Sequence, residues 1–293
     1  MANASRAVGN RSAAVTWTLR VVVVVYLFMI VAWPTGLVAQ NTFANGLDGL
    51  KTALSDPDVT HSLWLTVRVA LIAVAINLVF GVGMSLLLVR YRFPGKRILS
   101  ALIDLPLSVS PIVVGLALVL VYNPRYGWFG ETLSDNGIDV VFATPGIVMA
   151  TCFVALPLVV REVVPVLEEM GDEQEQAARS LGANGRQTFW RITLPGIRWA
   201  IVYGVVLSLA RSLGEFGAVK IVAGKSIGDK ETATLLVQRE YQNFNQDTAY
   251  SVSFLLVLAA VLCLVVVAIL RPKPESQRPA RRKQARPLVK EST

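Results

Sequence analysis

The chain has 293 residues, of which 54% are hydrophobic and only 16% are charged, and its mean hydropathy is +0.54. Charged residues make up about a quarter of a soluble domain, so this composition excludes an ordinary soluble protein and leaves apolar surface that must face lipid. The net charge is +8, but eight of the 28 basic residues lie near the C-terminus, between positions 271 and 290. Basic residues beside apolar segments indicate membrane orientation, so we expect no nucleic-acid partner.

Six apolar segments are each long enough to cross a bilayer as a helix, which satisfies its own backbone in lipid. The first segment follows a basic stretch and ends in a faint cleavage signal. It is longer than the apolar core of a signal peptide, so we interpret it as an uncleaved first helix. The expected spans are 21–39, 63–89, 98–122, 145–167, 194–217 and 249–270.

Basic residues alternate between the two sides of these spans and so predict an orientation. They gather between the second and third spans, between the fourth and fifth spans, and in the tail. By the positive-inside rule, both termini of this multi-pass protein lie in the cytoplasm of a bacterial cell. We expect an all-α integral membrane protein of about six transmembrane helices. Its expected parts are a cytoplasmic N-terminus at 1–20, a first helix and external loop at 21–59, a transmembrane domain at 60–270, and a basic cytoplasmic tail at 271–293 whose composition is typical of disorder.

The cytoplasmic segment 173–195 has the features of a docking element. Ala177, Ala178 and Leu181 form an apolar edge at helical spacing, and Gly182 permits a sharp turn before a second apolar edge. An amphipathic helix-turn-helix between two spans fits a partner's groove. The alternative is an interfacial helix that lies on lipid, and the pattern alone leaves both open.

This segment resembles the EAA loop of binding-protein-dependent ABC permeases, whose pattern runs E-A-A, three residues, G, and later I-x-L-P. The first position departs from the pattern, because Gln176 stands where the family usually has Glu. The resemblance implies a type I importer fold in which this loop is a coupling helix seated in a cleft of an ATPase subunit. The matching positions are Ala177, Ala178, Gly182, Ile192, Leu194 and Pro195. The expected coupling residues are Glu175, Gln176, Ala177, Ala178, Arg179, Gly182, Ala183 and Phe189.

Segments 105–115, 211–219 and 240–245 look like the sulfate and molybdate branch of this family and are most similar to CysW-type subunits of sulfate and thiosulfate importers. The resemblance implies translocation of sulfate, with thiosulfate as a second substrate. It also implies a complex with two ATPase subunits, a CysT-type second permease and an extracytoplasmic sulfate-binding protein. The same machine for molybdate or another oxyanion is the alternative. A membrane enzyme or receptor is a third reading, which predicts polar catalytic groups gathered at one membrane interface.

The third span is interrupted by Pro106 and Pro111, and Ser110 followed by proline is a helix-start signal. A half-helix that starts inside the membrane directs its positive dipole end and free N–H groups into the interior. Together with the hydroxyls of Ser108 and Ser110, these groups would stabilise a permeating dianion without trapping it. The alternative is a proline kink that only shapes packing.

The fifth span combines small residues with an ionisable pair. Gly204, Ser208 and Ser212 are spaced one turn apart, which suits close packing either within the chain or against a second permease. Arg211 and Glu215 are also one turn apart and serve either the anion or the structure. The residues expected along the anion pathway are Ser108, Ser110, Pro111, Ser208, Arg211, Ser212 and Glu215.

Other motifs do not support chemistry by this chain alone. Residues 223–226 resemble the end of a P-loop, but Val219 stands where its first glycine is required. His61 is the only histidine, and Cys152 and Cys263 lie inside apolar runs typical of inert thiols. We therefore expect no catalytic residue, cofactor or metal, and ATP hydrolysis by a separate subunit.

Overall fold

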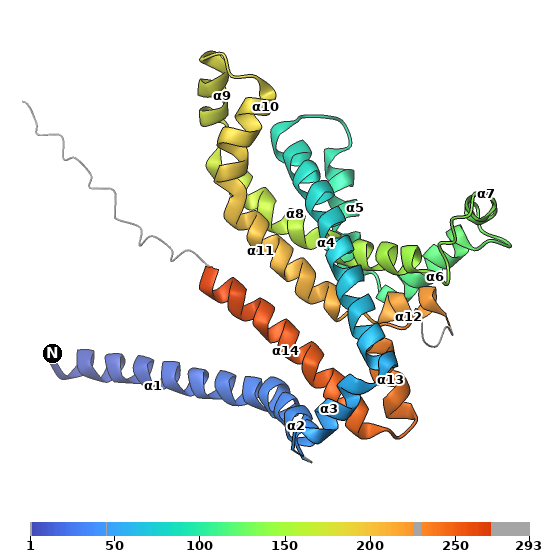
Figure 1. Cartoon of the computed structure of the whole chain (residues 1–293). Coiled ribbons are helices and arrows are strands. Elements are labelled where there is room, and N and C mark those ends of the chain that lie inside the picture. The colour runs from blue at the N-terminus through green and yellow to red at the C-terminus, as the bar shows by residue number, and fades with distance from the viewer. Residues whose placement is uncertain (1, 45, 225–229, 271–293) are drawn as a thin grey trace, which may run out of the picture.

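The protein is described by a computed structural model that covers residues 2–44, 46–224 and 230–270 (Figure 1). Every regular element in these ranges is helical. The basic tail expected at 271–293 lies outside the described residues. The α-helices are α1 (Ala2–Leu27), α2 (Trp33–Thr42), α3 (Asp48–Ser55), α4 (Pro57–Arg90), α5 (Lys96–Ser108), α6 (Pro111–Tyr122), α7 (Gly130–Asp135), α8 (Thr144–Met170), α9 (Glu173–Ser180), α10 (Gly185–Thr188), α11 (Leu194–Leu213), α12 (Gly217–Ala223), α13 (Ala233–Gln242) and α14 (Gln246–Leu270), with π-helical turns η1 (Phe28–Ala32) and η2 (Phe189–Thr193).

Five helical stretches in the described residues are long and apolar enough to cross a membrane, and a pair bent by 112° makes a sixth. This confirms the expected all-α, multi-pass architecture. The third span differs from the others because it is two helices at a steep angle. The stretches are Val15–Thr42, Pro57–Arg90, Thr144–Met170, Gly185–Leu213 and Gln246–Ile269, with Lys96–Ser108 and Pro111–Tyr122 as the bent pair.

Helix α8 is the centre of the bundle and packs between α4 and α11 (Figure 1). Val159 of α8 lies where the three helices meet and is fully buried. A Cβ added at Gly81 of α4 would lie 2.7 Å from Val159 Cγ1, and one at Gly204 of α11 would lie 2.9 Å from Val159 Cα. Small residues at such crossings allow the close approach that holds helices together in lipid. The small face of α11 is therefore used within the chain.

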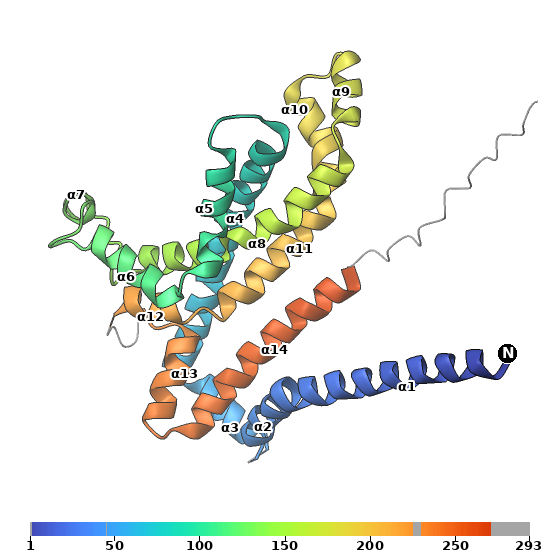
Figure 2. The ribbon, with the colours of Figure 1, turned by 180° about the vertical axis from the view of Figure 1, so that it is seen from behind.

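The break in the third span follows from its prolines. Pro106 is accommodated inside α5, which continues to Ser108, whereas Pro111 occupies the first position of α6. Ser110 is the N-cap residue, as expected. Its hydroxyl makes no capping hydrogen bond, and its carbonyl accepts the N–H groups of Val113 and Val114 at 2.9 and 3.2 Å. Figure 2 shows that α6 turns away from α5 and lies beside α12.

The fifth span starts earlier than expected. Helix α10, the π-helical turn η2 and α11 form one stretch from Gly185 to Leu213, so the second amphipathic piece is not a separate helix. The π turn lies directly before Pro195, and Leu194 N–H donates to Phe189 O, five residues back. The wider turn lets the helix pass a proline that supplies no N–H. The expected coupling segment, residues 173–195, is thereby joined to the fifth span by a continuous helix.

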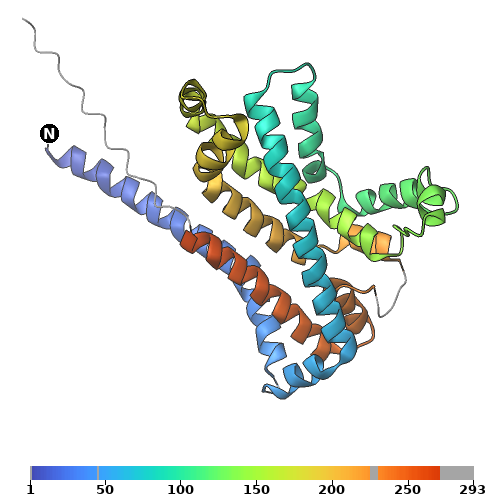
Figure 3. The same cartoon turned by 45° about the horizontal axis from the view of Figure 1, so that its top comes forward.

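The first span is placed apart from the other five. Figures 1 and 3 show α1 extending away from the bundle, while α2 and α3 lie beside α14. Thr42 Oγ1 donates to Tyr250 O at 3.0 Å, and the rings of Phe43 and Phe254 pack edge to face at 5.0 Å. The apolar window of this span is fully exposed in the isolated chain. The expected domain boundary at residue 60 falls in the first turn of α4.

The end of the molecule opposite α9 is fixed by one arginine. Arg239 of α13 lies within 3.1 Å of Glu231, 3.3 Å of Glu240 and 3.6 Å of Asp58 at the start of α4. Burial raises the pKa of Glu231, and the Arg239 charge opposes that shift. The cluster joins the segment after α12 to the start of the second span, at the end that we expect to face outward.

Candidate functional site

Helices α9 and α10 project from one end of the bundle, next to the α4–α5 turn (Figures 1 and 2). Leu181 is the C-cap residue that follows α9, and Gly182 makes the turn with a φ of +89°, which favours glycine. The N–H of Ala183 donates to Ala178 O at 3.0 Å, closing the helix end. As a result the Leu181 side chain is 89% exposed at the tip of the loop. A large apolar side chain held at such a tip is suited to bury itself in a partner.

The second helix of the loop begins with a capping box. Asn184 accepts the N–H of Gln187 at 2.9 Å, and the Gln187 side chain accepts the N–H of Asn184 at 2.9 Å. These two bonds satisfy donors that would otherwise be unpaired at the helix start. The loop between α9 and α10 is therefore a defined turn rather than a loose connection.

Glu175 is buried and anchors the base of the loop. Arg90, the last residue of α4, donates through Nε to both carboxylate oxygens at 3.1 and 3.2 Å. Its other nitrogens donate to Leu167 O and Gly171 O at 3.1 and 2.7 Å, and Thr193 Oγ1 donates to Glu175 Oε1 at 2.9 Å. The arrangement ties the ends of α4 and α8 to α9 and η2 through charge-assisted bonds in a low-dielectric site.

The expected coupling residues thus divide into three groups by exposure. Gln176, Ala177, Arg179 and Gly182 are exposed on the loop. Ala178, Ala183 and Phe189 are half-buried, and Phe189 packs against the apolar cluster between α8 and α11. Glu175 faces inward to Arg90, so its carboxylate positions the loop rather than contacting a partner directly.

The expected pathway serines separate in a similar way. Ser208 and Ser212 are buried on the face of α11 that carries Gly204, and their hydroxyls find no hydrogen-bond partner within the described chain. Ser108 and Ser110 are exposed, at the break between α5 and α6. Only this second pair is open to a permeating ion in the isolated subunit.

Arg211 and Glu215 form an ion pair at the end of the fifth span. Arg211 Nη1 lies 2.6 Å from Glu215 Oε2, and Glu215 Oε1 accepts the N–H of Ala218 at 3.0 Å in the first turn of α12. The Glu215 carbonyl accepts the Thr234 hydroxyl at 2.8 Å. Glu215 is therefore a buried hub of the α11–α12 break, whereas the Arg211 side chain is 38% exposed.

The starts of α6 and α12 pack against each other. A Cβ added at Gly217 would lie 3.1 Å from Pro111 Cβ, and one at Gly115 would lie 2.8 Å from Ala218 O. This contact brings the Ser110–Pro111 helix start next to the turn that holds Arg211 and Glu215. The structure therefore brings together one part of the expected pathway set, from two spans that lie 100 residues apart.

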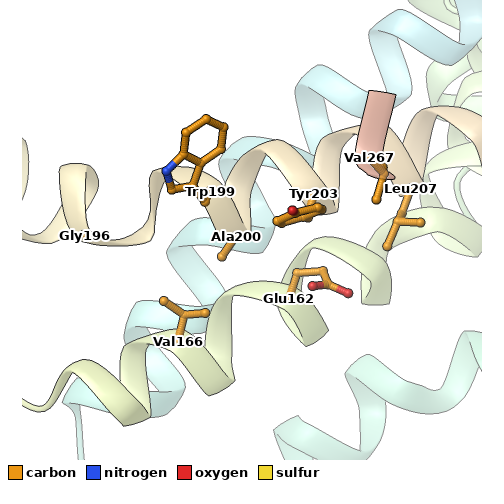
Figure 4. A pocket seen from close by; sticks show the side chains of 8 residues that line it. All are labelled: Glu162, Val166, Gly196, Trp199, Ala200, Tyr203, Leu207 and Val267. Atoms are coloured by element: carbon orange, nitrogen blue, oxygen red, sulfur yellow. The ribbon is translucent and has the colours of Figure 1, made fainter. Parts of the chain in front are cut away.

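A cavity of about 580 Å³ lies between α8, α11 and α14, away from these residues. Figure 4 shows Glu162 of α8 beneath the ring of Tyr203 of α11, with Val267 of α14 at one end. A carboxylate without a basic partner in the lining repels a dianion. The cavity is therefore unsuited to sulfate or another oxyanion.

The sequence patterns missed two ionic contacts. Arg90 reaches Glu175 over 85 positions, and Arg161 Nε lies 3.0 Å from Asp104 Oδ1 over 57 positions. Isolated charges at the ends or in the middle of apolar runs were the only available signal. Their pairing depends on helix packing that no local motif encodes.

Comparison with known proteins identifies relatives over most of the chain. Residues 77–271 match the family model described as the binding-protein-dependent transport system inner membrane component. The chain is 43% identical over 252 residues to the sulfate transport system permease protein CysW of Synechococcus elongatus, covering 86% of this chain and 88% of that protein. It is 43% identical to the Escherichia coli K12 protein of the same name, covering 81% of each, and 39% identical to the E. coli K12 sulfate transport system permease protein CysT, covering 75% of this chain and 79% of that one.

Solved structures show the same fold at lower identity. A bacterial ABC transporter that imports the acidic polysaccharide alginate aligns with a TM-score of 0.73 and 16% identity, over 89% of this chain and 94% of that chain. The alginate transporter in complex with an alginate pentasaccharide-bound periplasmic protein aligns with a TM-score of 0.72 and 15% identity. These matches support the architecture alone.

Proposed function

Since the chain belongs to the family of binding-protein-dependent transport system inner membrane components, we propose that it is the translocation subunit of an ATP-driven importer of sulfate. The observation that supports sulfate as the substrate is the identity of 43% to the sulfate transport system permease protein CysW of S. elongatus over 86% of the chain. The residues of this chain then bind, orient and pass the anion, while the chemistry of ATP hydrolysis belongs to other subunits.

The coupling loop supports a partnership with an ATPase. Its tip presents the exposed Leu181 beside a rigid Gly182 turn, and its base is fixed to the bundle by the Arg90–Glu175 pair. A docking element must be firmly joined to the helices that it moves, because slack in the joint would dissipate the motion. The stretch from α10 through α11 provides that joint. We infer two ATPase subunits, one beneath each permease subunit.

The second permease and the external protein complete the proposed complex. Similarity to both CysW and CysT proteins favours a CysT-type partner that differs from this chain. The alginate transporter, described in complex with a periplasmic protein, supports an extracytoplasmic binding protein here, which we propose binds sulfate. Both termini lie in the cytoplasm in this arrangement, with the coupling loop on the same side.

Arg211 and Ser110 are the proposed outer contacts for the anion, and Ser108, the last residue of α5, lies on the inner side of the break. A dehydrated dianion needs several weak polar partners, since a deep well of positive charge would hold it. Glu215 moderates Arg211 and keeps it in place, and the positive end of the α6 dipole lies nearby on a neighbouring helix. Ser208 and Ser212 are buried on α11 in the isolated subunit, so we do not count them among these outer contacts.

The test is uptake of labelled sulfate by the assembled complex in proteoliposomes. The binding protein is supplied at the external face of the complex, and ATP is supplied at its cytoplasmic face. Labelled sulfate should accumulate only with ATP, and unlabelled thiosulfate should compete with it more strongly than molybdate. Accumulation of molybdate without sulfate would establish the alternative oxyanion. An ATPase that fails to co-purify would contradict the importer assignment itself.

A further inference from the structure

A second set of polar groups lies on the opposite side of the α5–α6 break from Arg211. Lys96, Ser100, Asp104 and Ser108 recur at every fourth position of α5, from its first residue to its last. Residues one turn apart share a helix face, so the four form a polar stripe along a helix whose other residues, apart from Arg97, are apolar. The stripe runs from the end of the molecule that carries the coupling loop to the break in the third span.

Two adjoining grooves follow this stripe from Lys96 to Asp104. One, of about 720 Å³, opens beside Lys96 and Arg97 at the coupling-loop end. The next, of about 190 Å³, is lined by Asp104 and Arg161. Ser100 and two apolar residues, one from α4 and one from α8, line both grooves, so the two grooves adjoin.

Arg161 differs from Arg90, the arginine at the base of the coupling loop, in how many of its N–H groups make hydrogen bonds. Arg90 has 14% of its side chain exposed and donates through all three nitrogens. Arg161 is 58% exposed, donates only through Nε to Asp104, and its two Nη groups make no hydrogen bond within the described residues. A guanidinium can hold a carboxylate with one side and an incoming oxyanion with the other.

The depth of the pair in the spans argues against a simple lipid-facing role. Arg161 lies nine residues before the end of α8, and Asp104 lies inside the third span. Charged groups at such depth face a bundle interior or a water-filled path, because hydrocarbon does not stabilise them. Both side chains are about half exposed in the isolated subunit, which matches the wall of a path rather than a packed interior.

We propose that the stripe of Lys96, Ser100, Asp104 and Ser108, faced by Arg161, forms the cytoplasmic half of the anion pathway. The proposal rests on the proposed transport function and assigns residues to its inner half. Arg161 attracts the anion after it passes the break. Asp104 limits that attraction, so that the anion is released toward Lys96 and Arg97 rather than retained.

The test measures access to single cysteines in the full complex, with Cys152 and Cys263 first replaced by alanine. The variants Ser100→Cys and Ser108→Cys measure whether the stripe can be reached by a water-soluble reagent. The matched control is Leu102→Cys, which lies between them on another face of α5. Small anionic and cationic methanethiosulfonates are added from the coupling-loop side. Ser100→Cys should react at least about tenfold faster than Leu102→Cys with both reagents, because a water path admits charged reagents and lipid does not.

The role of the Arg161 charge is then tested by substitutions that remove it or its partner's charge. Arg161→Gln should lower the ratio of anionic to cationic modification at Ser100→Cys about tenfold, since one unit charge within several ångströms is lost. Asp104→Asn should raise this ratio. If Arg161→Gln does not assemble, the Asp104→Asn/Arg161→Gln double variant removes both charges together and leaves no unpaired ion, and its ratio should fall between those of the two single variants.

These results distinguish a failure of the proposed pathway from a failure of the proposed substrate. An unchanged ratio in Arg161→Gln, or a Ser100→Cys no more reactive than Leu102→Cys, overturns the proposal and shows that lipid or the second permease covers this face. The proposed function is then untouched if labelled sulfate still enters. Conversely, the expected ratios in a complex that imports no sulfate would support the pathway and refute the substrate.

Discussion

Arg90 and Glu175 are 85 positions apart in the sequence, yet their side chains form a buried, two-point ion pair at the base of the coupling loop. The pair joins the end of the second span to α9, and Thr193 extends it to the fifth span. The loop is therefore connected to the second and fifth spans through one carboxylate, and Arg90 also donates to the end of α8. In the proposed complex, this contact would transmit motion of the loop to the bundle.

Glu175→Gln should weaken this joint. Removing one partner of a buried pair costs about 3–5 kcal/mol, because the remaining charge stays buried without compensation. We expect a lower thermal midpoint of the purified complex, faster proteolysis between α8 and α10, and ATP-driven uptake reduced more than membrane insertion. Glu173→Gln, an exposed carboxylate two residues earlier, is the control. Equal uptake and proteolysis in the two variants would refute the anchoring role.

Leu181→Glu should uncouple transport without unfolding the subunit. The side chain is 89% exposed, so the substitution breaks no contact within the chain, but it places a charge in the proposed ATPase cleft. Uptake should fall more than tenfold at normal membrane abundance, and the ATPase should be lost on purification. Leu181→Met keeps the apolar contact and should remain active. Normal uptake by Leu181→Glu would mean that the tip does not dock.

Gly182→Pro should have a similar effect for a backbone reason. Gly182 has a φ of +89° and donates its N–H to Arg179 O at 3.0 Å, and proline permits neither feature. Gly185→Pro is a matched control, because Gly185 is the first residue of α10, where proline is favoured. Uptake should be lost only in Gly182→Pro. Equal losses in both variants would show general intolerance of the loop rather than a required turn.

The sequence predicts this fold where a local pattern is sufficient. Apolar run lengths located the spans, and the Ser110–Pro111 pair located the helix start within the third span, because both depend on neighbouring residues. The pairings of Arg90 and Arg161 could not be predicted, since they depend on how α4, α5 and α8 pack. For the same reason, sequence spacing grouped Ser208 and Arg211 in one pathway, although Ser208 lies on the buried face of α11.

Gly204→Ala should destabilise the bundle. The added Cβ would lie 2.9 Å from Val159 Cα, a backbone atom that cannot turn aside, so α8 and α11 must separate. Overpacking of this kind costs about 1–3 kcal/mol. Gly83→Ala, on an open face of α4, should be neutral or slightly stabilising. Thermal unfolding of both variants in detergent measures the difference, and equal midpoints would show that the crossing is looser than described.

Arg211→Ala should reduce uptake more than it reduces insertion or assembly. The side chain is 38% exposed at the end of the fifth span and is held by Glu215, whose own carboxylate also binds the first turn of α12. Removing the arginine takes away the cation and leaves the buried Glu215 carboxylate with the Ala218 N–H but without its charged partner, so we expect a lower thermal midpoint together with a larger loss of uptake. Glu215→Gln should act on the same step differently, because it frees Arg211 and leaves a stronger positive site that retains the anion.

Arg211→Lys should restore uptake only in part, since an ammonium cannot bridge a carboxylate and an oxyanion with a planar fork. Uptake rates at saturating binding protein, normalised to permease abundance, compare the three variants, and full activity in Arg211→Ala would confine this residue to a structural role.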